Sequence, residues 1–174
     1  NKSNGTGSAG RTLEILLGKA ADNAILPDYL GIEIKTQMIH THYRMSLFSM
    51  AFDNKPLEMQ RLLRICGYPD RVHPEIKVFQ VSVSGNRLKK LGFRACKLYV
   101  DYPSQVVRLL IFEFGKIVDK SMSWSFDELK SRLEHKLKYL AFIPCKKWVI
   151  NEKCYFKYLS LTFYQLKTFD IFLR

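Results

Sequence analysis

Polar and apolar residues alternate most regularly at residues 29–37, where Ile32 and Ile34 alternate with Glu33 and Lys35. A period of two is typical of a β-strand, because successive side chains point to opposite faces of a sheet. The pattern therefore predicts a strand whose isoleucines face the core. Glu33 and Lys35, two residues apart, are expected to share the opposite, solvent-exposed face.

The same kind of pattern predicts three helices and several further strands. Apolar residues spaced three or four apart indicate helices at residues 8–17 and 163–173, and another that begins at Ser125. Ser125 is the expected N-cap of this helix, with Glu128 as its capping-box partner. Apolar runs predict strands at residues 77–84, 95–100, 107–114, 141–150 and 154–161. This order of elements favours an α/β fold with a central mixed β-sheet flanked by helices.

The length and composition predict one folded domain. The chain has 174 residues, enough for a hydrophobic core, so residues 9–174 are expected to form one domain after a polar tail at residues 1–8. The sequence has no apolar run near the roughly 20 residues of a membrane span, and no signal-peptide pattern. Its four cysteines lack zinc-ligand spacing and are expected to be reduced, which indicates a cytoplasmic protein that binds no membrane.

The charge balance points to a partner. Lysine and arginine total 28 against 16 for aspartate and glutamate, which gives a formal net charge of +12. A protein this basic attracts polyanions, and nucleic acid is the commonest of them. The alternative is a basic protein that only tolerates its charge.

One group of residues, Asp28-x4-Glu33-x-Lys35, has the composition of a nuclease centre. Phosphodiester hydrolysis needs a metal ion that polarises the phosphate, an activated water, and a cation near the developing charge. Asp28 and Glu33 would supply carboxylate ligands for Mg²⁺, and the backbone carbonyl of Ile34 can reach the same ion. Lys35 would orient or deprotonate the water, or stabilise the pentacovalent phosphorane. Glu14, on the helix expected upstream, is able to point a third carboxylate at the site.

The pattern occurs twice, so its spacing alone does not identify the centre. Residues 69–77 repeat it with Asp70, Glu75 and Lys77. In this second copy the glutamate follows a proline, which suits a turn or the first residue of a strand. We therefore expect a charged loop at residues 69–77 and assign the centre to the first copy. The alternative for the first copy is a surface strand with a salt bridge between its glutamate and its lysine.

Two segments resemble the MvaI/BcnI restriction endonucleases, relatives of MutH and Sau3AI in the PD-(D/E)xK superfamily. They are residues 10–18 (GRTLEILLG) and 27–37 (PDYLGIEIKTQ), with weaker similarity at residues 46–49, 129–140 and 158–173. The resemblance implies a restriction-endonuclease-like core, metal ligation by Asp28 and Glu33, and catalysis by Lys35. It also implies a supporting role for Glu14, and a Mg²⁺-dependent enzyme that cuts or nicks double-stranded DNA at short sites.

Further polar residues are candidates for DNA contact. Gln37 matches the residue that usually follows the Lys-Thr pair in these endonucleases. His40 and His42 follow the predicted strand, where exposed polar residues at a strand end are the favoured alternative. A basic group would neutralise phosphates or belong to a solvated hairpin: Arg87, Lys89 and Lys90. Residues 146–158 interleave lysines with aromatics, for which packing in the core is preferred over stacking on nucleobases.

These patterns together predict a type II restriction-like endonuclease. Two alternatives are a MutH-like nickase and a catalytically inactive DNA-binding module of a larger protein. The endonucleases that the chain resembles continue past the last predicted helix into a strand that helps form the DNA cleft, whereas this sequence stops at Arg174. We therefore expect either a truncated domain or different recognition elements, in a monomer or as part of a larger protein.

Overall fold

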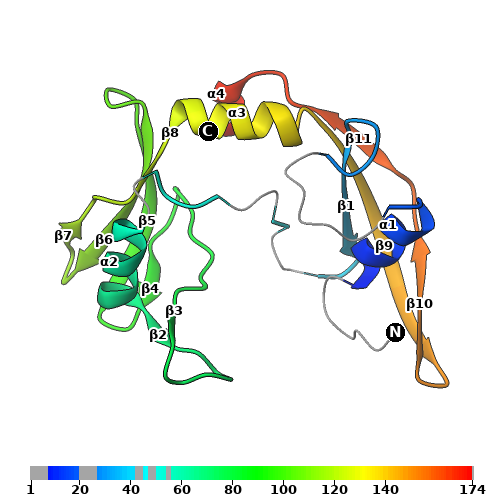
Figure 1. The fold of residues 1–174 in the computed structure, drawn as a ribbon, viewed down its shortest axis with the longest axis horizontal. Helices are drawn as coiled ribbons and strands as arrows, with labels where there is room; N and C mark the ends of the chain where they lie inside the picture. Colours follow the sequence, from blue (N-terminus) through cyan, green and yellow to red (C-terminus); the bar gives the residue numbers. More distant parts are fainter. Residues whose placement is uncertain (1–7, 20–26, 42–44, 47–49, 54–55, 174) are drawn as a thin grey trace. The chain divides into compact units, whose positions relative to one another are not determined.

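A computed structural model of the chain describes residues 8–19, 27–41, 45–46, 50–53 and 56–173. They divide into two compact units, each with its own sheet (Figure 1). The first unit combines residues 1–48 with residues 130–174, and the second comprises residues 49–129. The single domain expected from the sequence stays a prediction. The described part of the chain contains no helix that is long and apolar enough to cross a membrane.

A four-stranded sheet forms the centre of the first unit. Strand β1 (Glu33–Met38) pairs in parallel with β9 (Tyr139–Ile150), although the two are far apart in the sequence. Strands β10 (Lys153–Tyr158) and β11 (Thr162–Gln165) pair with β9 in the antiparallel direction. The helices are α1 (Ser8–Leu16), α4 (Phe169–Leu173) and the end of α3 (Phe126–Lys136), which begins in the second unit.

The register of this sheet sorts its side chains onto two faces. Glu33 pairs with Leu140, and Lys35 pairs with Phe142, in the parallel ladder. Paired residues of neighbouring strands point to the same side, and side chains alternate along each strand. The even-numbered residues of β9 therefore lie on the same side as Glu33. We call this side of the sheet the Glu33 face.

Helix α1 packs against the opposite face. The hydroxyl group of Tyr158 donates a hydrogen bond to the backbone carbonyl of Ala9 at 2.7 Å. A Cβ atom on Gly10 would lie 3.5 Å from Oγ1 of Thr36, so the helix approaches β1 closely. Tyr158 and Thr36 both point away from the Glu33 face by the register of the sheet. Helix α1 therefore supports β1 from behind the Glu33 face.

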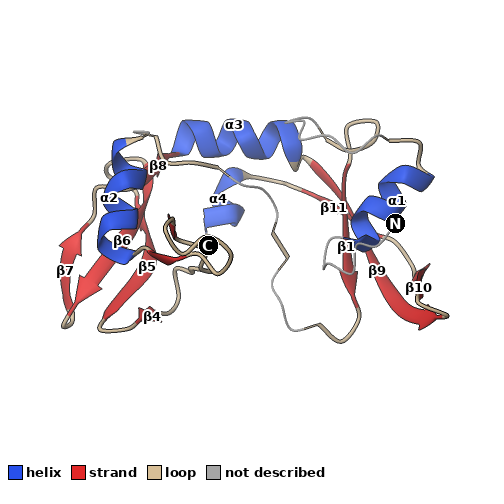
Figure 2. Ribbon diagram, turned by 60° about the horizontal axis from the view of Figure 1, so that its bottom comes forward, coloured by secondary structure: helices blue, strands red, loops and turns tan. Residues whose placement is uncertain are grey.

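The second unit is an antiparallel sheet with one packed helix (Figure 2). Its elements are α2 (Leu57–Cys66), β2 (Tyr68–Pro69), β3 (Lys77–Val78), β4 (Lys89–Leu91), β5 (Arg94–Asp101), β6 (Val106–Glu113), β7 (Lys116–Asp119) and β8 (Ser123–Ser125). The main sheet has the order β4-β5-β6-β7, and β8 also pairs with β6. Leu62 of α2 is 1% exposed and belongs to a buried cluster with Leu109 and Ile111 of β6.

Most predicted elements are confirmed with small shifts at their ends. The helix predicted at residues 8–17 is α1, and the strand predicted at residues 29–37 overlaps β1 at residues 33–37. At the start of α3, the Ser125 hydroxyl oxygen accepts a hydrogen bond from the Glu128 N–H at 3.3 Å, which confirms the N-cap. Helix α2 is not among the elements predicted from the sequence.

Two predicted elements are wrong. Residues 163–173 do not form one helix, because Thr162–Gln165 is strand β11 and only Phe169–Leu173 is helical. The apolar spacing suits a helix, but pairing with β9 satisfies the same backbone groups and suits the aromatic side chains. Residues 79–84 form no ladder, although their three alternating apolar side chains are partly buried against the core of the second unit.

The aromatic residues of the β9–β10 hairpin also correct an expectation. Trp148 and Tyr155 are 42% and 43% exposed, so the preferred interpretation as core residues is wrong for both. Phe156, on the opposite face of the hairpin, is half-buried. The cause is that β9 extends past the end of β1, so part of the hairpin has no neighbouring strand on that edge among the described residues.

Candidate active site on strand β1

A tight turn places Asp28 beside the start of β1. Tyr29 and Ile32 exchange backbone hydrogen bonds, with N···O distances of 3.0 and 2.8 Å. Between them, Leu30 and Gly31 have φ angles of 48° and 81°, and a two-residue type I′ turn requires positive φ at both positions. The turn folds the chain back, so that Asp28 lies next to the residues that follow Ile32.

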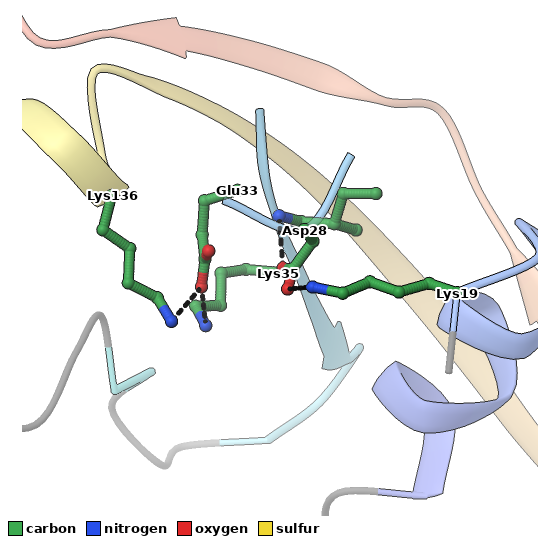
Figure 3. Close-up of polar contacts among 6 residues, drawn as sticks. Lys19, Asp28, Glu33, Lys35 and Lys136 are labelled. Atoms are coloured by element: carbon green, nitrogen blue, oxygen red, sulfur yellow. Dashed lines mark hydrogen bonds and ion pairs between the residues drawn. The ribbon is translucent and has the colours of Figure 1, made fainter. Parts of the chain in front are cut away.

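Both carboxylate oxygens of Asp28 accept hydrogen bonds (Figure 3). Oδ2 accepts one from the Ile34 N–H at 2.9 Å, and Oδ1 accepts one from Nζ of Lys19 at 3.0 Å. Burial by itself raises the pKa of Asp28, but these two hydrogen bonds and the ammonium groups of Lys19 and Lys35 outweigh it and leave the pKa below its usual value. Asp28 is therefore an ionised and fixed carboxylate at neutral pH.

Glu33 is buried, with 1% of its surface exposed, and the predicted solvent-exposed position is wrong. Its Oε1 atom accepts a hydrogen bond from Nζ of Lys35 at 2.5 Å and lies 3.7 Å from Nζ of Lys136 (Figure 3). Burial raises the pKa of Glu33. The two lysines oppose this effect without cancelling it, and the charge of Asp28 adds to it. The structure thus brings Asp28, Glu33 and Lys35 together, as the motif predicted.

The second carboxylate oxygen of Glu33 has no protein partner among the described residues. Oε2 is buried and takes part in no hydrogen bond there. A buried anionic oxygen without a partner is costly, and it marks a position that a cation would stabilise. Mg²⁺ is commonly held by one or two carboxylates together with phosphate oxygens of a substrate. Asp28 and Glu33 are therefore the residues of this site that could hold a divalent metal ion.

Glu14 lies apart from these carboxylates. It is half-buried on α1, which packs behind the Glu33 face, and a Cβ on Gly10 would lie 3.9 Å from its Oε1 atom. The described ranges contain no group of three or more histidine, cysteine or acidic side chains arranged to hold a metal ion. The structure therefore does not join Glu14 to Asp28 and Glu33 as a third ligand, and its supporting role stays a prediction.

The second copy of the motif forms a charged turn, as expected. Oδ1 of Asp70 accepts hydrogen bonds from the N–H groups of Val72 and His73, at 2.8 and 2.9 Å. The exposed carboxylate of Glu75 lies 3.3 Å from Nδ1 of His73. This copy is a hairpin loop between β2 and β3, in which the Asp70 N–H donates a hydrogen bond to the Ile76 carbonyl at 2.9 Å, and neither Asp70 nor Glu75 is buried. The same spacing thus produces a different local structure.

The candidate DNA contacts are distributed over both units. Gln37 is half-buried on the Glu33 face, and His40 is exposed just after β1 with a φ angle of 68°. His42 lies outside the described residues. A basic group is exposed in the second unit, in the loop before β4 and on β4 itself: Arg87, Lys89 and Lys90.

Two lysines of the site are absent from the sequence prediction. Lys136 ends α3 and contacts Glu33, although more than a hundred residues separate them in the chain. Lys19 follows α1 and pairs with Asp28. Both stand among many other lysines in the sequence, and only the packing of α3 and α1 around β1 distinguishes them. Of the two, Lys19 is the easier to predict from the sequence, because it lies close to the motif and just after a predicted helix.

Comparison with known proteins agrees with this architecture. The MvaI/BcnI restriction endonuclease family matches residues 1–174. A solved structure of restriction endonuclease MvaI in complex with its cognate DNA substrate is 34% identical and covers 97% of this chain and 69% of that chain, with a TM-score of 0.88. MvaI in the absence of DNA is 34% identical over 98% of this chain and 75% of that chain, with a TM-score of 0.57. No curated protein matches.

These comparisons confirm the predicted fold class, because the mixed α/β arrangement of this chain matches the fold of MvaI. They agree with the resemblance seen around β1 and extend it to the whole sequence. The chain belongs to the MvaI/BcnI restriction endonuclease family and is a type II restriction-like nuclease.

Proposed function

We propose that this chain hydrolyses phosphodiester bonds in duplex DNA at a short recognition site, and that cleavage requires Mg²⁺. Restriction endonucleases cleave DNA and generally use a divalent metal ion, and one solved structure of MvaI contains its cognate DNA. The observation that carries the proposal is the buried Oε2 atom of Glu33, which has no hydrogen-bond partner within the described residues and lies next to the oxygen that Lys35 binds. Strand β1 thus carries both a carboxylate that could bind a cation, on Glu33, and the ammonium group of Lys35.

Each residue of the site has a separate role in this proposal. Mg²⁺ held by Asp28, Glu33 and the Ile34 carbonyl would polarise the scissile phosphate and lower the pKa of a water molecule. Asp28 is kept ionised by its two hydrogen bonds and is ready to act as a ligand at neutral pH. Lys35 orients the attacking water or stabilises the negative charge that develops on the phosphate. Lys136 adds a second positive charge beside Oε1 of Glu33, the atom that Lys35 binds.

The wider DNA-binding surface is also part of the proposal. Gln37, His40 and His42 would contact DNA, and Arg87, Lys89 and Lys90 of the second unit would contact phosphates. The net charge of +12 supports a polyanion as partner. We propose that the chain acts in the cytoplasm as a monomer or as part of a larger protein.

The test is incubation of the chain with mixed genomic DNA and Mg²⁺, followed by sequencing of the new ends. We expect ends at one short sequence, and no ends when a chelator removes the metal. Asp28→Ala and Lys35→Ala are expected to lower cleavage at least a hundredfold while DNA binding persists. Asp70→Ala and Lys77→Ala, at the equivalent positions of the second copy, are matched controls and should cut normally.

The possible results separate the hypotheses. Cleavage that survives both Asp28→Ala and Lys35→Ala would contradict the assigned centre. Ends on only one strand would identify a nickase. DNA binding that Mg²⁺ leaves unchanged, with no cutting of any substrate, would identify an inactive DNA-binding module.

A further inference from the structure

The hairpin of β9 and β10 continues beyond the rest of its sheet. Strand β1 pairs with β9 only as far as Cys145, whereas β10 pairs with β9 out to Ile150 (Figure 1). Beyond Cys145, β9 and β10 therefore form a two-stranded ribbon within the described part of the chain. Asn151 and Glu152 close it, both with positive φ.

One face of this ribbon is exposed over its whole length. Its residues form three cross-strand pairs: Lys146 with Lys157, Trp148 with Tyr155, and Ile150 with Lys153. All six are exposed, and we call them the ribbon face. An aromatic pair thus stands between lysines at both ends. Neither β9 nor β10 contains an aspartate or a glutamate.

The ribbon face continues the Glu33 face. Glu33 pairs with Leu140, so every even-numbered residue of β9, including Lys146 and Trp148, points to the same side as Glu33. Lys146 and Trp148 follow Leu140 by six and eight residues. At roughly 3.3 Å per residue, they lie about 20 Å and about 26 Å from the level of Glu33 along the strand. A ligand bound across the Glu33 face can therefore extend onto the ribbon.

The chemistry of the ribbon face favours one class of partner. Three ammonium groups and no carboxylate attract phosphates. A two-stranded β-ribbon is narrow enough to enter the major groove of B-DNA, where exposed aromatic side chains can pack against base edges and sugars. A second copy of this chain is not expected to bind the ribbon face, because a two-fold contact would bring the lysines of both copies together.

We infer that the ribbon face binds the DNA duplex beyond one side of the cleavage site. At 3.4 Å per base pair, the distances above correspond to at most about six to eight base pairs from the scissile phosphate. This inference rests on the proposed function, because it takes the Glu33 face as the place of cleavage. It assigns a substrate-positioning role to Lys146, Trp148 and Tyr155.

The test compares neighbouring lysines on opposite faces of one strand. Lys146 lies on the ribbon face, whereas Lys147 pairs with Phe156 and points to the other side, although both are exposed. Binding of a labelled 30-base-pair duplex of mixed sequence is measured by anisotropy in a chelator, between 50 and 200 mM salt. Lys146→Gln should reduce the slope of log affinity against log salt by about 0.9, as expected for one lost phosphate contact. Lys147→Gln should leave that slope unchanged.

A second readout follows Trp148 directly. Iodide should quench the fluorescence of exposed Trp148 in the protein alone and much less after the duplex is added. The variant Trp148→Phe shows which part of the total tryptophan fluorescence comes from Trp148. Trp148→Ala should weaken duplex binding about tenfold. Once the cut site is known, the duplex can be shortened to four base pairs on one side of it. This change should weaken DNA binding by the wild-type protein and leave binding by Trp148→Ala unchanged.

Several results would overturn the inference. Equal salt slopes for Lys146→Gln and Lys147→Gln would do so, as would full iodide quenching of Trp148 in the DNA complex. Protection of Trp148 without DNA, together with a dimer mass by light scattering, would assign the face to self-association. The experiment distinguishes failure of this inference from failure of the proposed function. If DNA protects Trp148 but no Mg²⁺-dependent cutting occurs, the ribbon face binds DNA and the proposed nuclease activity is contradicted.

Discussion

Replacing Glu33 with glutamine removes a buried negative charge and keeps the shape of the side chain. Glu33 is 1% exposed, and its Oε2 atom has no partner among the described residues. In the proposed function this carboxylate would hold a metal ion, whereas without the metal its buried charge destabilises the folded protein. We therefore expect Glu33→Gln to abolish cleavage and to stabilise the metal-free protein.

The size of this stabilisation follows from two opposing contributions. An unpartnered buried polar group costs about 1–3 kcal/mol and a charged one more, so the neutral amide removes the additional cost of the charge, which we take as about 2 kcal/mol. The hydrogen bond from Lys35 at 2.5 Å becomes weaker by about 1 kcal/mol when its acceptor is no longer charged. The net gain in unfolding free energy is about 1 kcal/mol, which for a chain of this size raises the Tm by about 2–4 °C.

The gain should depend on pH in a defined direction. The pKa of Glu33 is raised in the folded state, so the folded protein binds this proton more tightly than the unfolded chain does. The destabilisation by Glu33 is therefore complete above its folded pKa. It fades as the pH falls through that pKa towards the ordinary value of 4.5. The advantage of Glu33→Gln should be present at pH 7.5 and largely lost below pH 4.5.

Thermal unfolding of both proteins in a chelator, from pH 7.5 to 4.5, measures this difference. Mg²⁺ in excess should raise the Tm of the wild type much more than that of Glu33→Gln, because the variant keeps Asp28 but loses one of the two carboxylate ligands. A Tm for Glu33→Gln at or below that of the wild type at pH 7.5, or a difference that does not shrink at low pH, would refute the reasoning. Equal responses to Mg²⁺ would place the metal elsewhere.

Three further changes test other parts of the structure. Asp119→Asn should cost about 2 kcal/mol, because the buried carboxylate accepts hydrogen bonds from Ser121 at 2.7 and 2.8 Å and pairs with Arg61. Despite burial, these contacts lower the pKa of Asp119 below 3.8, so urea titrations should show the cost at neutral pH and its loss at lower pH. Gly31→Ala should cost about 1 kcal/mol and slow cleavage in a gel assay, since φ is 81° and the turn positions the preceding carboxylate; unchanged values would exclude the type I′ turn. Leu62→Ala should cost about 2–5 kcal/mol, and calorimetry should show the whole transition shifting if residues 9–174 are one domain, or only one of two transitions if they are not.

The sequence predicts those features of the site that depend on near neighbours. Alternation over residues 29–37 locates β1, and the period of two places Glu33 and Lys35 on one face. The burial of Glu33 is not predictable in this way, because it depends on Lys136 at the end of α3 and on a parallel pairing with β9. The strand at Thr162–Gln165 is missed for the same reason, since its partner strand decides its conformation.

The two copies of the acidic motif show what the spacing does and does not determine. Both place four residues between aspartate and glutamate, but only the first has Leu30 and Gly31 at positive φ between two paired residues. That turn directs the aspartate onto the backbone of β1, whereas Asp70 binds the N–H groups of its own turn. The two copies therefore differ in the loop between aspartate and glutamate: the first has a two-residue turn, and the second is a longer hairpin loop between β2 and β3. Two sequence differences distinguish the copies: Gly31 lies two residues before Glu33, where the turn needs positive φ, and Pro74 lies immediately before Glu75.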